Sequence, residues 1–268
     1  MAHSSPALPL SIVIPFYNEE AWIGTTIESF VQQTDQRFRL LLVNNRSSDR
    51  SVEVATKAAA PLGDRAVILT EDRPGKIYAL AHGLDNTTEP LIATCDADTL
   101  YPPTYVETIL RLNAARPDAA MIMAIDLYAP AESDESRHRI AKILRRARRA
   151  PRKCFAGGYA QTFRTAWLRD AGGFDAKSWP YILEDHEVVS RVQRFGPSVY
   201  DADLYCFPST RRVDRSAMHW TRFERLAYRF VPAAWTEAFF HQFLAPRFAR
   251  RNAFAVAQRE KNWDDPSS

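Results

Sequence analysis

The sequence predicts an α/β fold in which helices flank a mostly parallel, Rossmann-like sheet. Over the first hundred residues, short apolar runs rich in Val, Ile and Leu alternate with segments whose apolar residues follow helical spacing. This alternation is typical of parallel sheets with right-handed crossovers. Polar residues follow the apolar runs, and ligands of such sheets bind at the carboxyl ends of the strands. The same pattern therefore predicts both the fold and the edge of the sheet that carries the site.

The expected elements can be placed in chain order. In the first hundred residues, strands are expected over residues 10–15, 38–43, 66–70 and 91–95. The helices between them are expected over residues 19–33, 48–60 and 75–83. Later helices are expected over residues 105–113, 132–150 and 185–195, and later strands over 119–125 and 199–205. We expect residues 1–215 to form one domain, on which residues 216–268 pack as a helical, aromatic-rich extension.

The composition narrows the class of protein. The formal net charge of +3 gives no reason to expect a nucleic-acid partner. The three cysteines are widely spaced and form no Cys-x-x-Cys pair, which indicates a reducing compartment and no zinc site. The segment Met1–Pro9 lacks the features of a signal peptide, and no apolar run is long enough for a spanning helix. We therefore expect a cytoplasmic protein, with the inner face of the membrane as an alternative location.

Two carboxylates, Asp96 and Asp98, stand one residue apart at the end of the apolar run over residues 91–95. Carboxylate oxygens are the ligands that Mg²⁺ and Mn²⁺ prefer. A strand that ends in this way predicts a divalent metal carrying a diphosphate. The alternative interpretation is that the two acids only cap a turn.

Five segments in this order resemble family 2 glycosyltransferases, and the resemblance covers about residues 10–212. The segments are Ser11–Glu20 (SIVIPFYNEE), Val43–Asp49 (VNNRSSD), Asp96–Asp98 (DAD), Gly172–Asp175 (GGFD) and Glu184-Asp185. The resemblance implies the GT-A fold, a nucleotide-sugar donor and inversion at the sugar carbon. Asn44-Asn45-Arg46 stands where the family has Asp-Asp-Gly. The Gln–Arg–Trp motif of processive relatives is absent, which favours transfer of a single sugar.

The resemblance also implies catalytic and metal roles. Asp98 is expected to bind Mg²⁺ or Mn²⁺, and Asp96 to contact the ribose or the metal. Asp185 is expected to act as the general base that takes a proton from the acceptor hydroxyl. Glu184 is expected to bind the acceptor or to orient the base. The two adjacent acids also fit the N-terminus of a helix, and both interpretations can hold together.

Nucleotide contacts are assigned by the same resemblance to residues that follow the strands. The nucleoside is expected to lie against Pro15, Tyr17, Glu19 and Asn44 or Asn45. An Asn carbonyl oxygen can accept the N3–H of uracil, as an Asp carboxylate would. Arg73 and Lys76 lie where relatives contact the base or the phosphates, or they are ordinary surface charges.

Three later features of the sequence give weaker indications of a functional role. Gly158 allows close approach of the acceptor, or only marks a turn. Arg211 and Arg212 resemble a basic loop that closes on the diphosphate in relatives. His219 is either a third metal ligand in that loop or a structural histidine.

A basic segment raises the question of a membrane contact. Residues 137–153 carry nine Lys or Arg and no acid. They form either a solvated helix face or a surface that attracts anionic lipid headgroups. The aromatic residues after Ser216 fit a lipid-linked acceptor at a membrane, and equally a core or an oligomer interface.

We therefore expect an inverting, metal-dependent glycosyltransferase that moves one sugar, from a UDP-sugar, to a hydroxyl of a glycan or lipid-linked acceptor. One alternative is an inactive relative that serves as a binding or scaffold subunit, which the Asn44-Asn45 replacement favours. Another is a sugar nucleotidyltransferase, although the segment after the first strand lacks the Gly-rich loop that such an enzyme needs.

Overall fold

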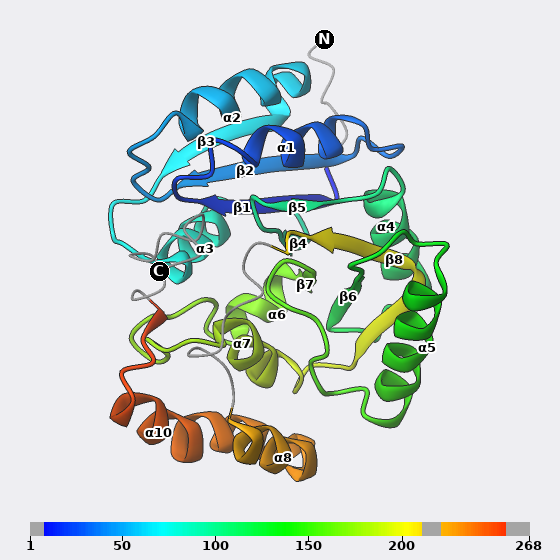
Figure 1. The fold of residues 1–268 in the computed structure, drawn as a ribbon, viewed down its shortest axis with the longest axis vertical. Coiled ribbons are helices and arrows are strands. Elements are labelled where there is room, and N and C mark those ends of the chain that lie inside the picture. The colour runs from blue at the N-terminus through cyan, green and yellow to red at the C-terminus, as the bar shows by residue number, and fades with distance from the viewer. Residues whose placement is uncertain (1–7, 211–220, 256–268) are drawn as a thin grey trace.

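An eight-stranded sheet with helices packed against it forms the body of the protein (Figure 1). The structure is a computed structural model, and it describes residues 8–210 and 221–255. The strand order is β3-β2-β1-β4-β7-β6-β8-β5. The strands are β1 (Leu10–Phe16), β2 (Phe38–Asn44), β3 (Ala66–Thr70), β4 (Leu91–Thr94), β5 (Thr99–Leu100), β6 (Met121–Asp126), β7 (Gln161–Arg164) and β8 (Ser198–Pro208).

Most helices of the sheet domain lie close to their predicted positions, but the helices over residues 60–65 and 165–170 were not predicted. The helices are α1 (Ile23–Val31), α2 (Ser51–Ala59), η1 (Ala60–Arg65), α3 (Lys76–Asp85), α4 (Tyr105–Ala115), α5 (Asp134–Arg149), α6 (Thr165–Asp170) and α7 (Glu184–Val192). The described helices after residue 220 are α8 (Arg222–Phe230), η3 (Ala233–Trp235), α9 (Thr236–Ala238), the π-helical η4 (Phe239–Leu244) and α10 (Ala245–Arg250).

The N-terminal half of the sheet is parallel, as predicted. Strand β1 pairs in parallel with β2 on one side and with β4 on the other. Every residue of β1 is buried, which is typical of a strand with helices on both faces. Helix α3 packs very close to β1, because a Cβ on Gly83 would lie 2.4 Å from Val13 Cγ1. This contact sets the depth at which α3 lies against the sheet.

The C-terminal half of the sheet is mixed, and two of its strands were not predicted. Strand β7 runs antiparallel to both β4 and β6, and the short β5 runs antiparallel to β8. The two residues of β5 are too few for a strand periodicity, and the sequence of β7, Gln-Thr-Phe-Arg, lacks an apolar run like that of β4. Their positions matter, because β7 brings the loop before it next to the end of β4. The pairing of β5 with β8 brings Ser209 next to Asp98, whose carbonyl oxygen accepts a 3.0 Å hydrogen bond from Ser209 N.

The described part of the C-terminal segment packs around Trp179. Phe240 and Phe248 contact the Trp179 ring, and all three side chains are fully buried. These aromatic residues are therefore core, one of the two interpretations left open above. Along residues 8–210 and 221–255, no helix is both long enough and apolar enough to cross a membrane.

Candidate active site

Four segments that are distant in the sequence meet at the carboxyl end of β4. Lys76 opens α3, Asp96 follows β4, Gly158 precedes β7, and Asp185 lies in the first turn of α7. The Nζ atom of Lys76 lies 2.5 Å from Asp96 Oδ1. A Cβ on Gly158 would lie 3.2 Å from Asp185 Cβ and 3.6 Å from Lys76 Nζ. The missing side chain at Gly158 therefore allows the Asp185 carboxylate and the Lys76 ammonium to lie close to the same point of the backbone.

The amide of Asn45 holds the loop that leads into α3. Its Oδ1 accepts a 2.8 Å hydrogen bond from Gly75 N, and its Nδ2 donates to the carbonyl oxygens of Glu71 and Arg73. A carboxylate has no proton to donate to these two carbonyls. Gly75 has φ +131°, a backbone conformation that residues other than glycine rarely adopt. Asn45 thus has a structural reason to replace the acid of related sequences, because it positions Lys76.

The loop after β1 is bound to the loop after β2. Ser48 N donates to Asn18 Oδ1 at 2.8 Å, and Glu19 N donates to Ser51 Oγ at 2.7 Å. Asn44 Oδ1 accepts a hydrogen bond from Ser47 N at 2.9 Å. These bonds keep the ends of β1 and β2 together, with Pro15 and Glu19 buried and Tyr17 half-buried. The predicted nucleoside residues Pro15, Tyr17, Glu19, Asn44 and Asn45 therefore belong to one edge of the sheet.

Arg73 lies beside this edge and interacts with its own loop. Its guanidinium pairs with the Glu71 carboxylate at 2.8 Å and stacks over the Tyr78 ring. The Arg73 side chain is nevertheless 61% exposed, so it remains open to a ligand. Arg211, Arg212 and His219, predicted for the diphosphate loop and the metal, lie outside the described residues.

The carboxylates of Asp96 and Asp98 fit a metal that carries a diphosphate. The backbone of Asp96 is fixed, because its N–H donates to the Tyr101 hydroxyl, which in turn donates to the carbonyl of Tyr159. Both aspartate residues are half-buried. In the described parts of the chain, no group of three His, Cys, Asp or Glu side chains could hold a metal by itself. Mg²⁺ commonly binds proteins through one or two carboxylates and completes its shell with phosphate oxygens and water.

The two acids at the start of α7 have different protonation preferences. Burial raises the pKa of Glu184, and the neighbouring Asp185 charge raises it further. Burial also tends to raise the pKa of Asp185, but His186 lowers it below its usual range through charge and a hydrogen bond. The Nδ1 atom of His186 lies 3.1 Å from Asp185 Oδ1. Asp185 is thus held ionised, which is the state a general base requires.

Lys76 is held in its charged form by the carboxylates around it. Burial opposes the charge of Lys76, but Asp96, Glu184 and Asp185 raise its pKa above the usual value. The backbone of Leu183, immediately before the acids, is left-handed with φ +65°, which is unusual for a bulky residue. Strain of this kind is common where a structure fixes the direction of functional side chains.

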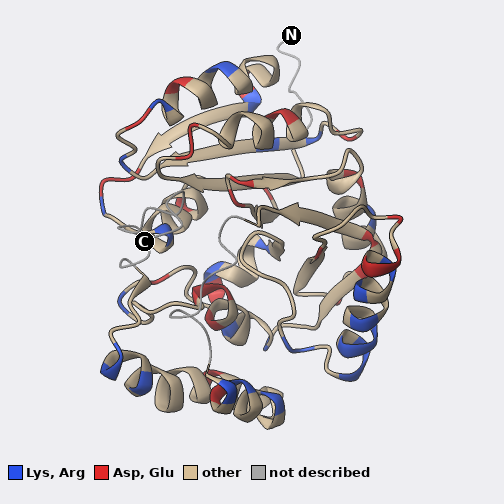
Figure 2. Ribbon diagram, viewed as in Figure 1, with Lys and Arg blue, Asp and Glu red and all other residues tan. Residues whose placement is uncertain are grey.

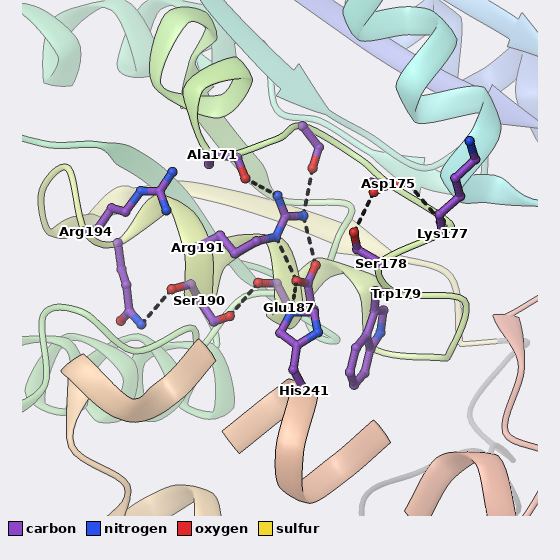
Figure 3. Close-up of polar contacts among 12 residues, drawn as sticks. Ala171, Asp175, Lys177, Ser178, Trp179, Glu187, Ser190, Arg191, Arg194 and His241 are labelled. Atoms are coloured by element: carbon purple, nitrogen blue, oxygen red, sulfur yellow. Dashed lines mark hydrogen bonds and ion pairs between the residues drawn. The ribbon is translucent and has the colours of Figure 1, made fainter. Parts of the chain in front are cut away.

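A buried ion-pair network supports α7 from behind (Figure 3). The Arg191 guanidinium contacts the Glu187 carboxylate at 2.7 Å and donates to the carbonyls of Ala171 and Gly173. His241 Nε2, on the π-helical turn η4, lies 3.0 Å from Glu187 Oε1. This network was not predicted, although the i,i+4 spacing of Glu187 and Arg191 is visible in the sequence. It joins the Gly172–Asp175 turn, the helix of Asp185 and the C-terminal segment.

Comparison with known proteins agrees with the predicted family. Residues 11–172, more than half of the chain, match Glycosyl transferase family 2. An undecaprenyl-phosphate 4-deoxy-4-formamido-L-arabinose transferase of Sodalis glossinidius is 34% identical over 109 residues, which are 39% of this chain and 33% of that protein. The uncharacterized glycosyltransferase YibD of Escherichia coli is 32% identical over 38% of this chain and 30% of its own length. The chain thus matches about a third of the length of these relatives.

Solved structures show the same fold over almost the whole chain. The mannosyltransferase PcManGT of Pyrobaculum calidifontis, in complex with GDP-Man and Mn²⁺, superposes with a TM-score of 0.67 at 18% identity. It covers 94% of this chain, and the match spans 73% of PcManGT. A fragment of S. aureus TarS, residues 1–349, in complex with UDP-GlcNAc gives a TM-score of 0.60 at 13% identity, over 94% of this chain and 76% of that fragment. The predicted GT-A fold is therefore confirmed, and the chain belongs to glycosyl transferase family 2.

Proposed function

We propose that this chain is a metal-dependent, inverting glycosyltransferase that moves a single sugar from a nucleotide-sugar to a hydroxyl acceptor. The observation that carries the proposal is the convergence of Asp185 with Lys76 and Asp96 around the bare backbone of Gly158. The residues around Gly158 thus offer both an ionised carboxylate and a cation, close to the end of β4. Sugar transfer needs a base for the nucleophile and positive charge for the leaving group.

On the donor side, the chain supplies both orientation and charge. Asp98 and Asp96 would hold Mg²⁺ or Mn²⁺, which supplies positive charge to the leaving diphosphate when it is bound. Lys76 lies beside Asp96 and would contact the phosphate oxygens directly. The loops after β1 and β2, with Pro15, Tyr17, Glu19 and Asn44, would hold the nucleoside. UDP is the preferred nucleotide, in line with the UDP-GlcNAc complex of TarS, while PcManGT binds GDP-Man.

On the acceptor side, Asp185 takes the proton of the acceptor hydroxyl. The acceptor oxygen forms a bond to the anomeric carbon as the bond from that carbon to the diphosphate breaks. The nucleoside diphosphate leaves from the opposite face, so the sugar carbon inverts in one displacement. Glu184, whose pKa is raised by burial and by Asp185, is suited to donate a hydrogen bond to the acceptor.

A second acceptor class is a lipid phosphate, because several matched relatives, including that of Sodalis glossinidius, are named as undecaprenyl-phosphate 4-deoxy-4-formamido-L-arabinose transferases. A phosphate monoester is largely ionised near neutral pH, so its oxygen needs little help from a base. The two acceptor classes therefore differ in how strongly they depend on Asp185. Turnover of Asp185→Asn on hydroxyl and on lipid-phosphate acceptors separates them.

The direct test is nucleotide release from UDP-, GDP- and dTDP-sugars with Mn²⁺ or Mg²⁺. Release of UDP with a candidate acceptor, and inversion at the sugar carbon by NMR, are expected. Donor binding without release would support the inactive scaffold. Formation of pyrophosphate from a nucleoside triphosphate and a sugar 1-phosphate would support the nucleotidyltransferase. Either result would overturn the proposal.

A further inference from the structure

Helix α8 presents an apolar face that the rest of the described chain leaves open. Phe223, Leu226 and Phe230 are 63%, 55% and 74% exposed, and Trp235 just beyond the helix is 69% exposed. These four are the most exposed large apolar side chains in the described parts of the molecule. At 3.6 residues per turn, the three on α8 lie within an arc of about 60°. Exposed apolar groups gathered on one face mark an interaction surface.

The adjoining face of α8 is basic. Arg222, Arg225 and Arg229 are exposed and fall within a neighbouring arc of about 60°. The single acid of the helix, Glu224, is buried and paired with Arg251. The exposed charged side chains of α8 are therefore all positive. Figure 2 shows these basic residues, with those of α10, at the end of the molecule opposite β3 and α2.

The third face of α8 is fixed to the protein body. Lys153 Nζ donates to the carbonyl oxygens of Tyr228 and Arg229 at 2.6 Å and 2.7 Å, at the C-terminal end of the helix. Thr221 and Glu224 form a capping box at the other end. The Tyr228 ring lies 6.4 Å from the His186 ring, which neighbours Asp185. The open apolar and basic faces are thus anchored close to the candidate catalytic helix α7.

We propose that the apolar and basic faces of α8 form a docking surface for an anionic lipid membrane. Aromatic and leucine side chains beside a row of arginines are the composition of helices that lie in the membrane interface. Phosphate headgroups complement the arginines while the apolar face enters the acyl boundary. A two-fold contact between copies of the chain through this surface would bring two arginine rows together, which is unfavourable. The proposal rests on the proposed function only in suggesting a lipid-linked acceptor.

The basic segment 137–153, interpreted above as either a solvated helix face or a surface for anionic lipid, lacks the apolar half of such a docking surface. On α5 the apolar side chains Ile143 and Ala147 are buried, while Arg145, Arg148 and Arg149 are exposed. Helix α5 thus offers charge without an apolar face that can enter a bilayer. The segment contributes to the surface at its end, through Lys153 and its contact with α8.

Co-sedimentation of the full chain with lipid vesicles tests the proposal. Wild-type protein should bind vesicles containing phosphatidylglycerol more tightly than vesicles of phosphatidylcholine alone, and less tightly as salt rises. Replacing Arg222, Arg225 and Arg229 by Gln should weaken binding on the order of a hundredfold, because each arginine contributes roughly fivefold. Replacing Phe223, Leu226 and Phe230 by Ser should abolish binding even at low salt.

A matched control removes the same charge from α5, by replacing Arg145, Arg148 and Arg149 with Gln, and should keep most of the binding. Thermal unfolding and nucleotide binding show whether each variant is folded with an intact donor site. Absence of wild-type binding, undiminished binding of the apolar variant, or a larger loss in the α5 variant would overturn the proposal. So would a dimer in light scattering that the apolar variant dissociates. Vesicle binding requires neither donor nor metal, so it can fail or succeed independently of sugar transfer.

Discussion

The ammonium group of Lys76 lies 2.5 Å from the carboxylate of Asp96, so the first helix residue after Gly75 contacts the first acid after β4. Under the proposed function, this ammonium group would compete with a metal for Asp96 before the donor binds. Once a diphosphate is bound, the ammonium group would move to a phosphate oxygen and leave Asp96 available to the metal. We therefore expect the contact to link metal binding to donor binding.

Lys76→Met should separate metal binding from donor turnover. Without the competing ammonium group, we expect Mn²⁺ alone to bind at least as tightly as in the wild type, because Asp96 is no longer paired. Donor turnover should fall, because one charge on the leaving diphosphate is lost. Isothermal titration with Mn²⁺, with and without UDP, measures the first effect, and nucleotide release measures the second. Weaker binding of Mn²⁺ alone would show that Lys76 supports the metal site instead.

Removal of the metal should stop turnover. With EDTA, nucleotide release is expected to disappear and to return when Mn²⁺ or Mg²⁺ is added in excess. Asp98→Asn should weaken metal-dependent UDP binding, because an amide oxygen carries no charge for the metal. Asp203→Asn, at a side chain that is 76% exposed, is the matched control and should behave as wild type. Full activity of Asp98→Asn would exclude Asp98 as a metal ligand.

Asp185→Asn should lower turnover without weakening donor binding. The substitution keeps the shape of the side chain and removes its basicity. Loss of a positioned general base costs roughly 10²–10⁴ in rate. Steady-state kinetics with a hydroxyl acceptor measures turnover, and UDP titration measures donor binding. If UDP binding falls in step with turnover, Asp185 is a donor-site or structural residue. If turnover is unchanged, Glu184 is the next candidate.

Arg191→Ala should destabilise the fold strongly. The substitution removes the Arg191 guanidinium from two backbone carbonyls and from the buried Glu187 carboxylate, which keeps only its contact with His241. Breaking a buried ion pair on one side costs about 3–5 kcal/mol. Urea unfolding measures the loss, and Arg194→Ala, at an exposed side chain just beyond the C-terminal end of α7, should stay within about 0.5 kcal/mol of wild type. Equal stability of the two variants would show that the network contributes little.

His241 should make stability depend on pH. The hydrogen bond with Glu187 is the main cause that raises the pKa of His241. Burial lowers this pKa, and the charges of Glu187 and Glu237 raise it further. A raised pKa in the folded state means that His241 stabilises the fold below its unfolded pKa of about 6.5. This contribution is lost as pH rises through the folded pKa. The difference in melting temperature between wild type and His241→Gln should therefore shrink from pH ~6 upward, and a constant difference would contradict the assignment.

Local sequence patterns already contain the parallel half of the fold and much of the candidate site. The β-branched runs of β1 to β4 and the helical spacing between them are short-range signals. They also place Asp96, Asp98, Asn44 and Asn45 after the strands, where ligands of α/β sheets bind. The roles assigned to these residues stay predictions. The acids of α7 could be identified as a pair from the sequence, but not which of the two is held ionised.

The remaining features depend on contacts between distant parts of the chain, which no local pattern encodes. Strand β7 pairs antiparallel with both β4 and β6, and this position in the sheet brings Gly158 close to Asp185. The structural role of Asn45 appears only when its amide meets three backbone groups of the Glu71–Gly75 loop.

The sequence by itself determined the family, the parallel strands and the residue types at their ends, because these follow from short-range periodicity and motif order. Only the tertiary structure decided that Lys76 pairs with Asp96, that His241 reaches Glu187, and that the open face of α8 lies near α7. Each of these depends on which side chains are buried and which remain exposed after packing. Burial is a property of the whole fold, so it becomes known only when all the elements are in place.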